Sequence, residues 1–93
     1  MALTPEGRVK AKVKAYLKER GIWFTMPAGT GFGASGVPDF LCCAEGRLVA
    51  VETKAPGKRN NTTAMQKAQI AAITASGGTA VVIDDVSQLA GVL

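Results

Sequence analysis

Residues 37–56 read VPDFLCCAEGRLVAVETKAP, a pattern that predicts two apolar strands joined by a short turn. Three charged side chains interrupt the pattern, since Asp39 lies in the first strand and Glu52 and Lys54 lie in the second. A strand that is apolar on both faces is normally buried, and a buried charge is costly unless it is paired or bound to a metal. This stretch therefore sets the fold and raises the question of what offsets its charges.

The register of this hairpin follows from its turn. If the turn is symmetric about Glu45 and Gly46, Asp39 falls opposite Glu52, with their Cβ atoms about 4.5–5.5 Å apart. Lys54 lies on the same face because side chains alternate along a strand. Two arrangements would accommodate these charges: a divalent cation between the two carboxylates, for which oxygen ligands favour Mg²⁺ or Mn²⁺, or a Lys54–Glu52 ion pair with Asp39 exposed. We favour the metal site.

The composition excludes several classes of protein. The 93 residues suffice for one small domain, residues 1–93, and contain no apolar run of the ~18 residues that a membrane span needs. The first residues lack the regions of a signal peptide, so we expect an intracellular protein. Histidine is absent, which excludes Ser/His/Asp and Cys/His catalysis and argues against a zinc site. The adjacent Cys42 and Cys43 should point to opposite faces of their strand and stay reduced.

The rest of the chain predicts alternating helices and strands. Thr4, Pro5 and Glu6 have the residue types of a helix start. The expected elements are a helix capped by Thr4 that runs over 5–20, a strand over 22–26, the hairpin, a helix capped by Thr62 or Thr63 that runs through 76, a strand over 79–84 and a short closing helix over 86–93. This order predicts an α/β sandwich in which helices flank a central mixed sheet.

Two polar side chains fall on helix faces that should point inward. Glu6 precedes Val9 by three residues on the apolar side of the first helix, although its first-turn position also suits the helix dipole. Gln66 precedes Ile70 by four residues and Ile73 by seven, and we expect both isoleucines to be buried. Polar groups on inward faces need partners, so both residues are candidates for the same site as Asp39.

A glycine-rich segment precedes the hairpin. Gly31, Gly33 and Gly36 match G-x-G-x-x-G, the pattern of dinucleotide-binding loops. Such a loop must open a helix whose N-terminus holds the pyrophosphate, whereas Pro38 and the residues after it predict a strand. We therefore expect no nucleotide cofactor, and instead a loop whose glycines let the backbone approach another group or serve as a flexible connection.

The hairpin also carries a known signature. Pro38-Asp39 followed by Glu52-Thr53-Lys54 resembles the PD-(D/E)XK nuclease motif. It is embedded as SGVPDFL…VAVETKAPGKRN…MQKAQ, between helices that carry Glu6 and Gln66. In this fuller form the chain resembles the VRR-NUC (virus-type replication-repair nuclease) family over nearly its whole length, in its stand-alone viral or phage type. The resemblance implies a restriction-endonuclease-like fold and, if a phage encodes the chain, the cytoplasm of the host cell.

The resemblance further implies an Mg²⁺- or Mn²⁺-dependent, structure-selective endodeoxyribonuclease that acts on branched DNA such as four-way (Holliday) junctions. By position in the motif, Asp39, Glu52 and the Thr53 carbonyl would bind the metal. Lys54 would orient or deprotonate the attacking water and stabilise the transition state. Gln66 would hold Lys54 or the water, and Glu6 would act behind the metal ligands or through a second metal. A homodimer is also implied, and it suits a two-fold branched substrate.

The charge of the chain is compatible with a polyanionic partner, because 11 Lys and Arg outnumber 7 acidic residues and give a net charge of +4. A lysine row on the first helix could equally be a solvated face. An alternative function is a non-catalytic DNA-binding module that keeps the nuclease fold. The candidate nucleic-acid-binding residues are Lys10, Lys14, Ser35, Lys58, Arg59 and Lys67.

Overall fold

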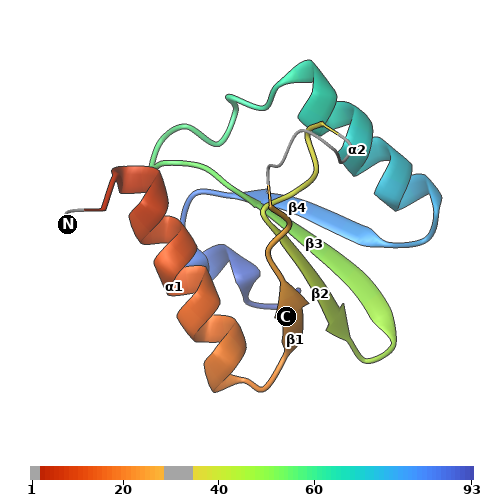
Figure 1. The fold of residues 1–93 in the computed structure, drawn as a ribbon, viewed down its shortest axis with the longest axis horizontal. Coiled ribbons are helices and arrows are strands. Elements are labelled where there is room, and N and C mark those ends of the chain that lie inside the picture. Colours follow the sequence, from red (N-terminus) through yellow and green to blue (C-terminus); the bar gives the residue numbers. More distant parts are fainter. Residues whose placement is uncertain (1–2, 29–34) are drawn as a thin grey trace.

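The computed structural model describes residues 3–28 and 35–93, so Gly31, Gly33 and Phe32 lie outside the described residues. Figure 1 shows helices packed against a central sheet, which confirms the predicted α/β class. The elements are α1 (Pro5–Glu19), β1 (Trp23–Thr25), β2 (Phe40–Ala44), β3 (Arg47–Thr53), α2 (Ala64–Ala75), β4 (Thr79–Ile83) and a 3-10 helix, η1 (Val86–Leu89). In the described part of the chain, no helix is long and apolar enough to span a membrane.

The sheet is mixed, as predicted, with strand order β1-β2-β3-β4. β1, β2 and β3 pair antiparallel, and β3 pairs parallel with β4 after the chain crosses over through α2. The predicted hairpin register is confirmed, because Leu41 pairs with Ala50. Its turn residues Glu45 and Gly46 both have positive φ, 52° and 75°, which is typical of the type I′ turn that matches strand twist. This two-residue turn sets Asp39, just before β2, on the level of Glu52.

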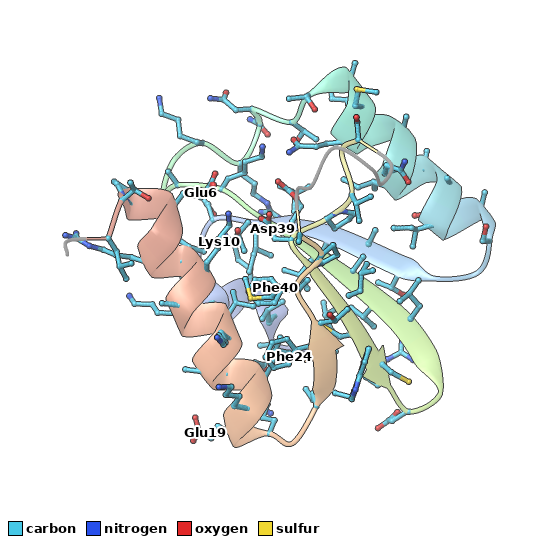
Figure 2. All side chains as sticks on the ribbon, in the orientation of Figure 1. Glu6, Lys10, Glu19, Phe24, Asp39 and Phe40 are labelled. Carbon is cyan, nitrogen blue, oxygen red and sulfur yellow. The ribbon has the colours of Figure 1, made fainter. Side chains whose placement is uncertain are left out.

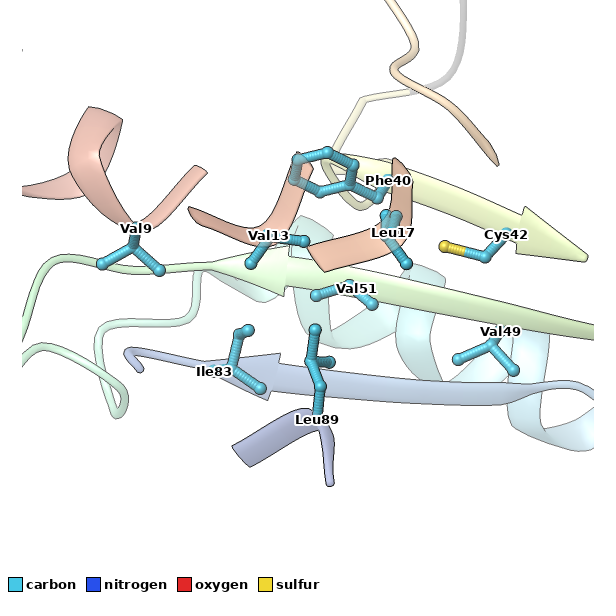
Figure 3. Close-up of a cluster of buried hydrophobic side chains, with 9 residues drawn as sticks. All are labelled: Val9, Val13, Leu17, Phe40, Cys42, Val49, Val51, Ile83 and Leu89. Atoms are coloured by element: carbon cyan, nitrogen blue, oxygen red, sulfur yellow. The ribbon is translucent and has the colours of Figure 1, made fainter. Parts of the chain in front are cut away.

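One face of the sheet holds the hydrophobic core. Side chains from α1, β2, β3, β4 and η1 meet there (Figure 3), namely Val9, Val13, Leu17, Phe40, Cys42, Val49, Val51, Ile83 and Leu89. The hydroxyl of Tyr16 donates to the Leu93 carbonyl at 2.7 Å and ties the C-terminal residues to α1. Burial raises the pKa of the Cys42 thiol to about 11, so this cysteine acts as a small core residue, whereas Cys43 is exposed.

The opposite face of the sheet carries α2, which buries less than its sequence predicts. Ile70 and Ile73 are only half-buried, so the expectation that both are buried is wrong. The helix packs mainly against β4. Because β4 is at the edge of the described sheet, the apolar stripe of α2 is covered only in part. Its start is fixed by a capping box between Thr63 and Gln66. In the described structure, no residue of α2 is fully buried.

The ends of the other elements follow the expected chemistry. Thr4 caps α1 by accepting from the Gly7 N–H at 3.0 Å, and Gly21 has φ +67° just beyond the helix. The closing helix is shorter than predicted, because the 3-10 helix ends at Leu89. Gly91 then adopts φ +83°, a conformation that does not continue a right-handed helix.

Candidate functional site

The predicted site residues come from four elements that meet at one end of the hairpin. β3 ends with Glu52 and Thr53 and is followed directly by Lys54, while Asp39 immediately precedes β2. Gln66 lies in the first turn of α2. Figure 2 shows Asp39 at the centre of the molecule, facing the first turns of α1. The site therefore lies where both helix layers meet the sheet, and residues far apart in sequence come together there.

Asp39 is fixed by Thr53. Its Oδ2 atom accepts hydrogen bonds from the Thr53 backbone N–H at 2.9 Å and from the Thr53 hydroxyl at 2.6 Å. The N–H and C=O of one residue point to the same side of a strand, so the Thr53 carbonyl is directed to the Asp39 side as well. Asp39 thus presents its second oxygen, Oδ1, in a set orientation beside a main-chain carbonyl.

Gln66 bridges the two buried charges of β3. Its Nε2 donates to Glu52 Oε2 at 2.9 Å, and its Oε1 accepts from Lys54 Nζ at 2.8 Å. Lys54 Nζ also lies 3.6 Å from Glu52 Oε2. Glu52 is 4% exposed and Lys54 is 8% exposed. Burial restricts the freedom of both side chains. The two hydrogen bonds of the Gln66 amide then fix the Lys54 ammonium and the Glu52 carboxylate relative to each other.

The other oxygen of Glu52 has no such partner. Among the described residues, Oε1 is buried and accepts no hydrogen bond. Burial, with the negative charges of Asp39 and Glu6 adding to it, raises the pKa of Glu52 to about 7, although Lys54 acts in the opposite direction. An ionised carboxylate in this position has an unmet need for a cation or a hydrogen-bond donor.

Glu6 reaches the site through Lys10. The Lys10 ammonium lies 3.4 Å from Glu6 Oε2 and 3.6 Å from Asp39 Oδ1, and Figure 2 shows the three side chains together beside the first turns of α1. The pairing of Lys10 with Asp39 was not predicted from the sequence. The Glu6–Lys10 spacing of four residues was the available signal, but it says nothing about Asp39, which another element supplies.

The residues at this site fit the divalent cation that the sequence suggests. The available donors are all oxygen: Asp39 Oδ1, Glu52 Oε1 and the Thr53 carbonyl. Within the described ranges, no group of three or more His, Cys, Asp or Glu side chains could hold a metal ion. Two carboxylates with a main-chain carbonyl are nevertheless sufficient for Mg²⁺, which takes one or two carboxylates and keeps several waters. A metal bound by Asp39 would replace the Lys10 ammonium as the positive charge that balances this carboxylate.

The candidate DNA-binding residues lie on several sides of this site. Lys58 and Arg59 belong to the loop that links β3 to α2, and Arg59 Nε donates to the Val82 carbonyl at 2.9 Å. Lys67 follows Gln66 on α2 and is exposed, as are Lys14 on α1 and Ser35 before the hairpin. Their part in DNA binding stays a prediction, as do the catalytic roles above.

The fold can be compared with known proteins. No protein-family model matches the chain, and no curated protein matches it. A solved structure named "VRR_NUC domain" is 26% identical, with a TM-score of 0.74 over 97% of this chain and 95% of that one. A second, named "VRR_NUC domain protein", is 18% identical, with a TM-score of 0.79 over 99% of this chain and 87% of that one. The resemblance to the VRR-NUC family is confirmed, and the chain has this nuclease-type fold over nearly its whole length.

Proposed function

We propose that this chain, with its VRR-NUC fold, is a metal-dependent endodeoxyribonuclease that cleaves branched DNA such as four-way junctions. The observation that carries the proposal is the pair of carboxylates, Asp39 and Glu52, beside a lysine held by Gln66 at a buried strand end. Lys54 is buried. Lysine is rarely buried unless it is paired, so the burial of Lys54 indicates a specific role at this site. Phosphodiester hydrolysis uses these groups together.

In the proposed mechanism, Asp39, Glu52 and the Thr53 carbonyl would hold the metal. When bound, Mg²⁺ or Mn²⁺ supplies a Lewis acid for the phosphate and lowers the pKa of a bound water. Thr53 keeps Asp39 oriented through two hydrogen bonds. Lys54 then orients the attacking water and stabilises the charge that develops on the phosphate oxygens. Gln66 holds the lysine in the position from which it acts.

A second candidate is a non-catalytic DNA-binding module with the same fold. It is favoured by the two ion pairs, Lys10–Asp39 and Lys54–Glu52, which balance both carboxylates without a metal. Against it, Glu52 Oε1 is a buried acceptor without a donor among the described residues, and such atoms are rare in native proteins unless a water, an ion or a ligand satisfies them. This acceptor makes the nuclease the better proposal.

The test is cleavage of an end-labelled four-way junction beside its linear arms, in Mg²⁺, in Mn²⁺ and in chelator. The key variant is Asp39→Asn, which keeps an acceptor for Thr53 but removes the charge. Asp85→Asn is its matched control, because Asp85 is exposed and its acceptor role toward Ser87 survives the change. We expect paired nicks near the branch for the wild type and the control, and a loss of at least about 100-fold for Asp39→Asn with junction binding retained. Equal cleavage by the two variants would refute the site.

We also propose that the nuclease acts as a homodimer through the open part of the α2 face of the sheet. Trp23, Cys43 and Leu48 lie opposite one another across β1, β2 and β3, so they share one face. Trp23 is 64% exposed and Leu48 is 44% exposed, whereas Phe24 packs against Phe40 with ring centroids 5.9 Å apart. A two-fold contact of this row with its own copy would bury it and supply two sites for two cuts.

A further inference from the structure

A basic cavity lies at the edge of the sheet, outside the catalytic residues. Its volume is about 550 Å³. Two cations, Arg59 and Lys67, line it together with Asn60 and Thr62, and its wall is the β4 segment 80–82. None of these lining side chains is acidic. The cavity therefore combines positive charge, neutral hydrogen-bonding groups and an exposed strand edge.

The strand edge supplies outward-directed backbone groups. Among the described strands, β4 is the last of the sheet and pairs with β3 alone. The Ile83 carbonyl faces β3, because it accepts from the Lys54 N–H at 2.8 Å. Backbone direction alternates along a strand, so Val82 and Ala80 direct their N–H and C=O groups away from the sheet, into the cavity. The bond from Arg59 to the Val82 carbonyl agrees with this direction.

Arg59 is held in place by that bond. Its Nε–H is used on Val82, which leaves the four N–H groups of the two terminal nitrogens. The loop that carries it is anchored as well, because the Gly57 N–H donates to the Asp84 carboxylate at 2.9 Å. A guanidinium fixed in this way has lost part of its side-chain entropy before any ligand binds. It presents a planar fork of donors suited to the two oxygens of a phosphate.

The cavity is close to the candidate catalytic centre. Val82 pairs with Glu52 across β3 and β4, strands are spaced about 4.8 Å apart, and Lys67 directly follows Gln66 on α2. The outer edge of β4 is therefore roughly 5–10 Å from the Glu52 strand. One nucleotide of a duplex strand advances about 3.4 Å along the axis, so the cavity lies about one to three nucleotides from the phosphate at the centre.

We propose that this cavity binds a non-scissile phosphate of the DNA strand, one to three nucleotides from the cut, through Arg59 and Lys67. The inference rests on the proposed function, because it takes the end of β3 as the place of cleavage. Such a contact would fix the register of the strand without reading its sequence. It fits an enzyme that selects the shape of its substrate.

A competing explanation for Arg59 is protection of the open edge. An edge strand can pair with another chain, and a charged group over its carbonyls prevents this. Edge protection predicts that loss of Arg59 promotes association of the protein while its contact with DNA stays the same. Lys67 separates the two explanations, because it lines the cavity from α2 and makes no bond to β4.

The experiment measures DNA binding by fluorescence anisotropy in chelator, where no cleavage occurs, at salt concentrations from 50 to 200 mM. Arg59→Ala is compared with Arg47→Ala, and Lys67→Ala with Lys18→Ala. Arg47 and Lys18 are exposed residues at the turn of the hairpin and in the last turn of α1, and neither of them lines the cavity. Each pair removes the same charge from the protein, so the comparison isolates the position of that charge.

The slope of log K against log salt is negative. We expect Arg59→Ala and Lys67→Ala each to make this slope less steep by about 0.9, with no such change in their controls. Between 50 and 200 mM salt, a variant that lacks one phosphate contact should lose about 3.5-fold less affinity than the wild type loses. Slopes that match the controls, including the case in which no variant or wild type binds DNA, would overturn the proposal. If the slopes change but the wild type never cleaves DNA, the phosphate site stands and the proposed nuclease function fails.

As a second readout, replacing single phosphates near the cut by uncharged methylphosphonates should weaken wild-type binding at one position. The same replacement should leave the binding of Arg59→Ala unaffected.

Discussion

Replacing Glu52 with glutamine tests whether its buried carboxylate is held at an energetic cost. In the metal-free protein, burial, with the charges of Asp39 and Glu6 adding to it, raises the pKa of Glu52 from 4.5 to about 7. A carboxyl group with a raised native pKa stabilises the fold fully below its unfolded pKa, and this contribution is lost as the pH rises through the native value. Stability should therefore fall between about pH 4.5 and pH 7.

The size of this loss follows from the same two values. At about 1.36 kcal/mol per pKa unit, the difference corresponds to roughly 3 kcal/mol of unfolding free energy. Glu52→Gln cannot ionise, but it keeps an acceptor for the Gln66 amide, whose donation to Oε2 is 2.9 Å long. Relative to the wild type, the variant should gain roughly 3 kcal/mol between pH 4 and pH 8.

The assay is urea unfolding followed by circular dichroism at pH 4 to 8, in chelator. Glu19→Gln is the matched control, since Figure 2 shows Glu19 at the other end of α1 from Asp39. The control should follow the wild-type pH dependence. If the curves of Glu52→Gln and the wild type stay parallel across this range, the carboxylate is not destabilised and the argument for its need of a cation fails. Mg²⁺ at pH 8 should stabilise the wild type and leave Glu52→Gln unchanged.

Two further substitutions test the loop before the hairpin and the proposed dimer. Gly36 has φ +77°, and a Cβ there would lie 2.5 Å from the Met65 backbone carbon, so Gly36→Ala adds a clash to the backbone strain and should cost about 3–5 kcal/mol in urea unfolding. Gly46 has φ +75° with open space around it, so Gly46→Ala should lose only about 1–2 kcal/mol, and equal losses would contradict the close approach. In sedimentation, Trp23→Ser should convert the dimer to a monomer. Met65→Ser, which changes another exposed apolar residue, should leave the dimer intact. A wild type that is already monomeric would refute the interface.

Local sequence patterns were enough to predict much of the fold. The period-2 pattern and the turn at Glu45 and Gly46 predicted the hairpin and its register, because an even two-residue turn leaves a single pairing. Thr4 marked the start of the first α-helix, and the sequence narrowed the start of the second to Thr62 or Thr63, of which Thr63 is the cap. Such features depend on residues a few positions apart, and the sequence states those directly.

Long-range packing was predicted less well. The period of α2 correctly put Gln66, Ile70 and Ile73 on one face, but it could not show that this face meets only the margin of the sheet. Periodicity gives the direction of a side chain and does not give the area that covers it. The expected burial of both isoleucines was wrong for this reason, while the inward position of Gln66 agrees with the structure.

The sequence by itself determined which residues could form a site, because the hairpin register sets Asp39 level with Glu52 and alternation adds Lys54 to that end. Only the tertiary structure decided how these groups are paired. Gln66 bridges Lys54 and Glu52 from α2, and Lys10 reaches Asp39 from α1. The reason is physical: pairing within a hairpin is set by local geometry, whereas contacts between a helix and a strand end depend on how two layers pack, which no short stretch of sequence specifies.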